Sequence, residues 1–180
     1  VQVTDANGCT RTETVTVSEP TALQFTSSAS AVRCNGGADG SVNVSIQGGT
    51  SPYTYLWSNG QTTSTATGLN AATYTVTVFD QYGCTSTCSG VVSELPPITI
   101  AFNNIVNSTC DLNNGTATAS ASGGTPPYNF VWSNGQLGSV LKNVGGGSYT
   151  VTGTDANGCS KADSVVITGT AALSMVVSQG

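Results

Sequence analysis

Residues 48–61 read GGTSPYTYLWSNGQ, and residues 123–136 repeat this stretch as GGTPPYNFVWSNGQ, with ten of 14 positions identical at an offset of 75 residues. A second motif occurs three times at the same offset, as TDANGC at 4–9, FDQYGC at 79–84 and TDANGC at 154–159. A fixed period of this length is typical of an array of like modules. The chain is therefore predicted to consist of tandem repeats.

The quoted stretch predicts a strand followed by a tight turn. Tyr53, Tyr55 and Trp57 occupy alternate positions, so in an extended strand they share one face. The pair Asn59-Gly60 follows directly and is typical of a tight hairpin turn. We therefore expect a half-buried strand whose aromatic face lies in a core.

Period-two alternation continues through the rest of the repeat. In SVNVSI (41–46) the apolar residues alternate with Ser and Asn, and in TYTVTVF (73–79) they alternate with Thr. No segment has a helical period. About six short strands per repeat, at roughly ten-residue spacing, are the pattern of a β-sandwich. The fold is thus predicted to be all-β, with tandem Ig-like β-sandwich modules. The strands expected in the first full repeat are 22–32, 41–47, 53–58, 61–69, 73–79 and 84–93.

The internal alignment also predicts the domain boundaries. Residues 1–19 match the end of a repeat, so they are interpreted as the C-terminal part of a truncated upstream copy. Full β-sandwich repeats are expected at 20–94 and 95–169, and 170–180 matches the start of a following copy. Prolines near both junctions restrict the backbone there, which favours stiff linkers. We therefore expect the sequence to be a window cut from a longer array.

The composition excludes several classes of function. Charged residues make up 7% of the chain, there is no histidine, and the net charge is −5. A chain with only four basic residues offers no patch for nucleic-acid phosphates. No apolar run approaches the roughly 20 residues of a membrane span. Without histidine or another evident base to activate Ser or Thr, we expect neither catalytic activity nor a cofactor.

Six cysteines without histidine favour disulfides over a zinc site, and hence an extracellular location. If every connection between strands reverses direction, the loops carrying Cys34 and Cys84 lie at the same end of one sandwich. This predicts a Cys34–Cys84 bond and an equivalent Cys110–Cys159 bond, with free buried thiols as the alternative. The partner of Cys9 would lie upstream. Cys88 has no counterpart in the other repeats, and the sequence leaves its state open.

Two sets of residues invite a functional interpretation but have a simpler one. Trp57 and Trp132 are predicted to be core anchors, with exposed platforms for sugar rings as the alternative. Asp5, Asp80 and Asp155 are predicted to open D-x-x-G turns by accepting hydrogen bonds from their own backbone. Calcium ligation by these three carboxylates is the weaker alternative.

The order Cys…GGT-x-P-Y-x-x-x-W-S-N-G-Q…YTVT-x-x-D-x-x-G-C resembles the SprB-type repeat of Bacteroidetes cell-surface proteins and gliding-motility adhesins. The resemblance covers the whole chain. The second copy lacks one residue after its loop cysteine, and Cys88 is an addition. The resemblance implies type IX secretion, a long tandem array on the bacterial surface, and a role in attachment.

The function expected from the sequence is therefore that of a structural or adhesive segment in a surface stalk or filament. Its expected partners are neighbouring repeats, together with surface polysaccharide or other surfaces. Two alternatives remain open at this point. One is a glycan-binding module, which requires an exposed aromatic cleft. The other is the accessory stalk of a secreted enzyme, which only the full-length sequence would reveal.

Overall fold

The computed structural model describes residues 1–173, so residues 174–180 of the stretch predicted to begin another repeat lie outside the described residues. The chain divides into two compact units. One unit comprises Val1–Ser28, Asn43–Ala66 and Tyr74–Gly90, and the other comprises Ala29–Val42, Thr67–Thr73 and the described residues from Val91 onward.

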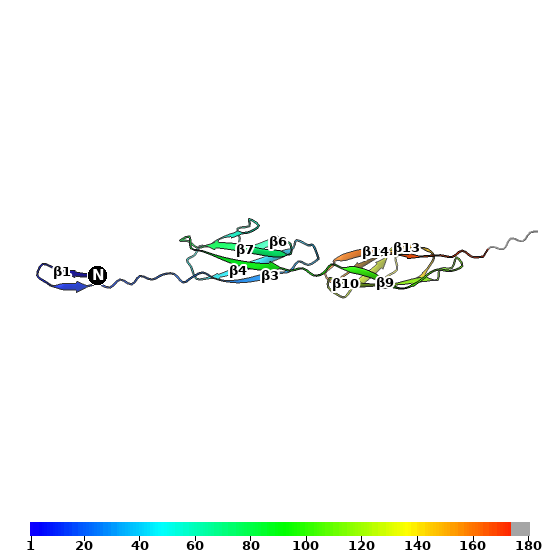
Figure 1. The fold of residues 1–180 in the computed structure, drawn as a ribbon, viewed down its shortest axis with the longest axis horizontal. Helices are drawn as coiled ribbons and strands as arrows, with labels where there is room; N and C mark the ends of the chain where they lie inside the picture. Colours follow the sequence, from blue (N-terminus) through cyan, green and yellow to red (C-terminus); the bar gives the residue numbers. More distant parts are fainter. Residues whose placement is uncertain (174–180) are drawn as a thin grey trace, which may run out of the picture. The chain divides into compact units, whose positions relative to one another are not determined.

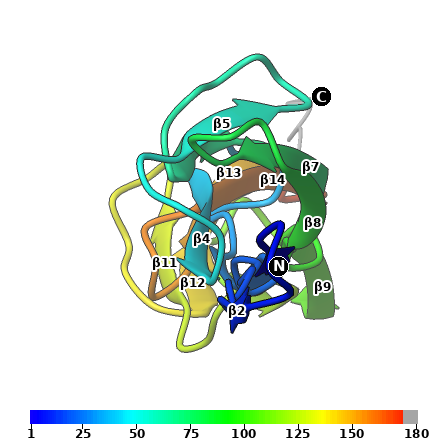
Figure 2. The ribbon, with the colours of Figure 1, turned by 90° about the vertical axis from the view of Figure 1, so that its left-hand side faces the viewer.

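The N-terminal residues form a small hairpin, and the first full repeat follows it. The hairpin pairs β1 (Gln2–Thr4) with β2 (Thr10–Thr12). The repeat contributes two three-stranded sheets, ordered β3-β4-β6 and β5-β7-β8. Figure 2 shows the strands of the second of these sheets side by side. The strands are β3 (Gln24–Ser30), β4 (Gly40–Gln47), β5 (Thr54–Trp57), β6 (Thr65–Leu69), β7 (Ala72–Phe79) and β8 (Thr85–Val92).

The second repeat has the same strand order, in the sheets β12-β10-β9 and β11-β13-β14. Figure 1 labels β9, β10, β13 and β14 of this repeat. In both repeats the first, second and fourth strands form one sheet, and the third, fifth and sixth form the other. These are the A-B-E and C-F-G sheets of an Ig-like sandwich without its D strand. The prediction of an all-β, Ig-like fold is therefore confirmed. The strands are β9 (Thr99–Val106), β10 (Gly115–Ser122), β11 (Asn129–Trp132), β12 (Val140–Val144), β13 (Gly147–Thr154) and β14 (Ser160–Ile167).

The core of the second repeat is built from the alternate residues of these strands. Trp132 on β11 is 2% exposed, and its ring centroid lies 6.1 Å from that of Phe102 on β9. Burying large apolar side chains contributes about 1.5–3 kcal/mol each, so this cluster is the main stabilising element. The buried members are Ala117, Ala119, Trp132, Leu141, Val144, Val151, Val165 and Ile167.

Each tryptophan also fixes the turn that follows its strand. The indole Nε1 of Trp57 donates to the carbonyl oxygen of Thr63 at 2.7 Å, and that of Trp132 donates to Gly138 at 3.0 Å. The residues after Trp57 are held in this turn, so the fourth strand begins at Thr65. The predicted strand at 61–69 was therefore too long at its start.

A Gly-Gly pair precedes the third strand of each repeat and lies against the incoming linker. Gly123 has φ +80°, and a Cβ there would lie 2.1 Å from the carbonyl oxygen of Pro97. Gly48 has φ +76° and the same relation to Ala22, at 2.2 Å. Only glycine allows such a close approach of two backbones. The Ser51-Pro52 and Pro126-Pro127 peptide bonds that follow are cis.

The part of the chain that the structure describes includes no helix with the length and apolar character of a membrane span.

Candidate functional site

A disulfide joins Cys34, in the loop between β3 and β4, to Cys159, in the turn between β13 and β14. The two Cα atoms are 5.6 Å apart, within the ordinary range for such bonds, and 125 positions separate the cysteines in sequence. Cys34 belongs to the first full repeat and Cys159 to the second. The bond is therefore a covalent link between successive repeats.

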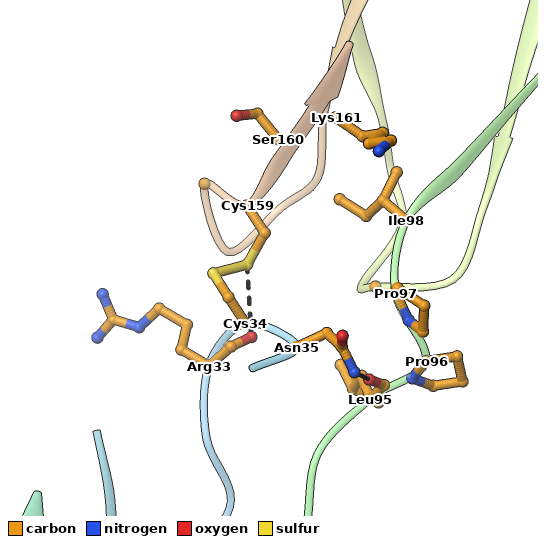
Figure 3. A pocket seen from close by; sticks show the side chains of 12 residues that line it. Arg33, Cys34, Asn35, Leu95, Pro96, Pro97, Ile98, Cys159, Ser160 and Lys161 are labelled. Carbon is orange, nitrogen blue, oxygen red and sulfur yellow. Dashed lines mark hydrogen bonds between the residues drawn. A yellow bond between two sulfur atoms is a disulfide. The ribbon is translucent and has the colours of Figure 1, made fainter. Parts of the chain in front are cut away.

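The cysteine pair lies in a pocket that also contains the linker between the repeats (Figure 3). The carbonyl oxygen of Arg33 accepts a hydrogen bond from Asn157 Nδ2 at 3.3 Å and lies 3.5 Å from Cys159 Sγ. Asn35 Nδ2 donates to the carbonyl oxygen of Leu95 at 2.9 Å. Polar contacts on both sides of the bond thus hold the loop against the linker and the turn. The lining residues named in Figure 3 are Arg33, Cys34, Asn35, Leu95, Pro96, Pro97, Ile98, Cys159, Ser160 and Lys161.

The loop that carries Cys34 is also held by main-chain donors. The Val32 nitrogen donates to the Ser93 carbonyl at 3.0 Å, and the Gly36 nitrogen donates to Glu94 Oε2 at 2.7 Å. Within the loop, the Arg33 nitrogen donates to Asp39 Oδ1 at 3.0 Å. These hydrogen bonds hold the loop through groups other than the two sulfur atoms.

The predicted cysteine pairing is wrong. The structure pairs Cys34 with Cys159, whereas the sequence argument paired Cys34 with Cys84 and Cys110 with Cys159. In the structure Cys84 and Cys110 are exposed thiols. The prediction identified two cysteines that form a bond but assigned them to the wrong partners.

The physical reason is that one connection in each sandwich does not reverse the chain. In the second repeat β9 and β12 are both antiparallel to β10, and β11 and β14 are both antiparallel to β13. The short connection at Gly145-Gly146 turns β12 back into β13. It follows that β11 and β12 run in the same direction. The missing D strand would have supplied the reversal that the prediction counted.

Hydrogen bonds place the two cysteines of the second repeat at opposite ends. Near Cys110, the Ser108 nitrogen donates to the carbonyl of Thr168, just after β14, at 2.9 Å. Near Cys159, the Ala156 nitrogen donates to the carbonyl of Thr125, just before β11, at 2.9 Å. The first repeat has the same strand order, so the same argument rules against the Cys34–Cys84 pairing.

Four cysteines of the described residues carry free thiols. Cys9, Cys84 and Cys110 are exposed, and Cys88 on β8 is half-buried. Cys88 Sγ lies 3.8 Å from the Ser89 carbonyl oxygen. The structure thus gives a thiol at the one cysteine whose state the sequence left open.

The aspartates of the three D-x-x-G-C motifs accept hydrogen bonds from main-chain nitrogens. Asp155 Oδ1 accepts from Asn157 and Cys159, both at 2.9 Å, and Oδ2 accepts from Thr125 at 2.9 Å. Asp80 and Asp5 make the corresponding bonds to their own cysteines at 2.9 Å. Each carboxylate thereby fixes the turn that presents its cysteine.

These hydrogen bonds affect the pKa of Asp155 and Asp80. Burial by itself raises the pKa of Asp155, but main-chain donors led by Thr125 outweigh it and lower the pKa below its ordinary value. Burial likewise raises the pKa of Asp80 by itself, but main-chain donors led by Cys84 outweigh it and lower the pKa below its ordinary value. A calcium ion would have to displace these donors. Among the described residues no three His, Cys, Asp or Glu side chains are grouped to hold a metal ion.

The two tryptophans lie away from the solvent. Trp57 and Trp132 are each 2% exposed, on the third strand of their repeats. Neither indole offers a flat face on which a sugar ring could stack.

Sequence reasoning missed the residues that line the disulfide. Arg33 contributes its main-chain carbonyl, which no sequence motif identifies. The sequence pointed only weakly to Asn157, because the matching position in the first full repeat is Tyr82 and the residue type is therefore not the same in both repeats.

Solved structures similar to this chain include proteins with Ig domains. An amphioxus IgVJ-C2 molecule is 19% identical with a TM-score of 0.33, the match covering 67% of this chain and 90% of that one. DIP-gamma IG1+IG2 is 11% identical with a TM-score of 0.38, covering 82% and 97%. Extracellular domains 3–5 of Drosophila OTK are 14% identical with a TM-score of 0.38, covering 81% and 62%. The strand order by itself establishes the Ig-like fold.

A search of the curated proteins gives no match. The family model described as the SprB repeat does match, at residues 26–62 and 102–137. Each segment lies inside one of the two sandwiches, so the resemblance that the sequence motifs indicated is confirmed. Two segments of this chain therefore match the SprB repeat, and each lies within an Ig-like β-sandwich.

Proposed function

We propose that this chain is a structural and adhesive segment of a bacterial cell-surface protein, similar to the stalk or filament of a gliding-motility adhesin. The match to the SprB repeat at two segments supports a cell-surface repeat. The observation that carries the proposal furthest is the Cys34–Cys159 bond. A bond between two repeats strengthens an array of modules, whereas a single binding domain gains nothing from it.

The surface chemistry supports weak, distributed adhesion over recognition of one charged ligand. Only 7% of the residues are charged, so long-range electrostatic attraction is small. Several apolar side chains on the strands are exposed, including Val91 at 63% and Val166 at 62%. Many shallow contacts multiplied along an array give avidity without any strong single site. The proposed partners are neighbouring repeats and polysaccharide or other surfaces, in an extracellular setting and without catalysis.

Bead detachment under flow tests the adhesive part of this proposal. Beads coated with the oxidised chain should hold to polysaccharide films and to glass more strongly than albumin-coated beads. Their detachment force should change little between low and high salt, because few charges take part. Matched beads carrying the Trp132→Ala chain, whose core is disrupted, distinguish a folded surface from nonspecific protein contact. Detachment at the force of the albumin beads would refute an adhesive role.

A further inference from the structure

The residues around Cys84 match those around Cys159, except that no second loop of the described residues contacts Cys84. The pocket at Cys84 is lined by the linker before β3, by Gly49 and by the start of β8. The positions one repeat later line the disulfide pocket. They are the linker before β9, Gly124 and the start of β14. The disulfide pocket has in addition the loop Arg33–Asn35, for which the Cys84 pocket has no counterpart. The shared positions are Pro20, Thr21, Ala22, Leu23, Gly49, Cys84, Thr85 and Ser86, matching Leu95, Pro96, Pro97, Ile98, Gly124, Cys159, Ser160 and Lys161.

The backbone around the two cysteines is also the same. The Asp80 nitrogen donates to the Cys84 carbonyl at 3.0 Å, and the Asp155 nitrogen donates to the Cys159 carbonyl at 2.9 Å. The linker is held alike, since the Gly49 nitrogen donates to the Thr21 carbonyl at 2.7 Å and Gly124 donates to Pro96 at 2.9 Å. Cys84 is therefore presented as Cys159 is presented to its partner.

The loop of Cys110 contacts the outgoing chain as the loop of Cys34 does, although Cys110 and Asp111 have φ +54° and +55° and their counterparts in the Cys34 loop do not have positive φ. The Ser108 nitrogen donates to the Thr168 carbonyl at 2.9 Å, as Val32 donates to Ser93 at 3.0 Å one repeat earlier. The residue after each cysteine donates a hydrogen bond to the outgoing chain. Asn35 Nδ2 donates to the Leu95 carbonyl at 2.9 Å, and the Asp111 nitrogen donates to the Thr170 carbonyl at 3.0 Å. The Asp111 carboxylate accepts from the Ala172 nitrogen at 2.9 Å. Cys110 is therefore held beside the outgoing chain as an exposed free thiol.

Exposure separates the bonded cysteines from these two. Cys34 and Cys159 are half-buried, whereas Cys84 and Cys110 are exposed thiols. Beside Cys84, Tyr82 is 73% exposed at the position where Asn157 contacts the Arg33 carbonyl. A second loop seated on this turn would cover both side chains.

We propose that the Cys34–Cys159 bond is one of a series, and that Cys84 and Cys110 are half-sites for the same bond to further copies of this repeat. The loop cysteine of each repeat bonds the D-x-x-G-C cysteine of the next. Cys110 takes the D-x-x-G-C cysteine of a following copy, and Cys84 takes the loop cysteine of a preceding copy. Each bond joins two thiols with loss of two protons and two electrons. A small-molecule disulfide such as glutathione disulfide accepts these and is reduced to two thiols.

Adding one repeat to the full chain tests the proposal by counting thiols. The chain has six cysteines, four of them free. A second copy of residues 95–169, inserted directly after Gly169, adds two cysteines. The exposed Ser148 of this copy is replaced (Ser148→Thr), so that the peptide carrying its Cys159 differs in mass from the original. After oxidation by glutathione disulfide and denaturation, the extended chain should titrate four thiols, because a second disulfide forms. Non-reducing peptide mapping should link Cys110 to the second copy of Cys159.

Two controls make the result unambiguous. Cys110→Ser in the extended chain removes one half-site on an exposed loop, so five thiols are expected. In a second chain, a copy of residues 20–94 is placed directly before Pro20. A disulfide should then form between Cys84 and the added copy of Cys34. Six thiols in the first extended chain, or a map linking Cys110 to Cys159 of its own repeat, would overturn the proposal.

Discussion

Breaking the Cys34–Cys159 bond should lengthen the chain under tension by an amount that the cysteine positions determine. With the bond intact, tension applied to the termini crosses from Cys34 to Cys159 over Cα atoms 5.6 Å apart. The 125 positions between them are shielded. Only the segments outside the bond extend, so β3 and β14 are the sandwich strands that tension can peel.

Reduction releases the shielded segment. At about 3.3–3.6 Å per residue, those 125 positions add about 410–450 Å of contour length. Single-molecule force spectroscopy with handles at both termini, with and without dithiothreitol, measures this gain directly. Cys34→Ser should give the long extension without reductant, and Cys110→Ser should behave as the unmodified chain.

Two results would refute this reasoning. Equal contour lengths in oxidised and reduced chain would show that no bond limits extension. A gain of only about 160–180 Å would match the 49 positions from Cys110 to Cys159, and would restore the pairing within one repeat.

Three further outcomes are expected. Trp132→Ala should destabilise the second repeat by about 3–5 kcal/mol in urea unfolding, while Val131→Ala on the exposed face of the same strand should change stability by about 0.5 kcal/mol or less; equal effects would contradict the core role. Gly123→Ala should cost more than Gly135→Ala, since both glycines have φ near +80° but only the first lies against a carbonyl, 2.1 Å from the added Cβ; thermal melts of the two variants decide this. The lowered pKa of Asp155 stabilises the fold fully above the unfolded pKa of about 3.9, and this contribution is lost as the pH falls below that value. Asp155→Asn should therefore weaken the acid dependence of stability measured from pH 6 to pH 2, and an unchanged dependence would refute it.

The fold was predictable because every local signal agrees. Alternating residues such as Val42 and Val44 are buried at 0% and 4%, and the aromatic strand ends in the Asn-Gly turn that its sequence indicates. The disulfide was not predictable from the same signals, because its position depends on strand directions. Val131 and Val140 lie on strands that run in the same direction. The sequence between these strands does not indicate that the D strand of an Ig-like sandwich is absent.

The span of the disulfide also constrains the order in which the chain matures. For a disordered chain Cys159 would meet Cys110, 49 positions away, more readily than Cys34, 125 positions away. The loop-closure difference is about 0.8 kcal/mol, or roughly a four-fold preference for the nearer thiol. The folded sandwich reverses this preference by holding Cys110 and Cys159 at opposite ends. Oxidation that outpaces folding would therefore favour the bond within one repeat, and folding before oxidation favours the Cys34–Cys159 bond.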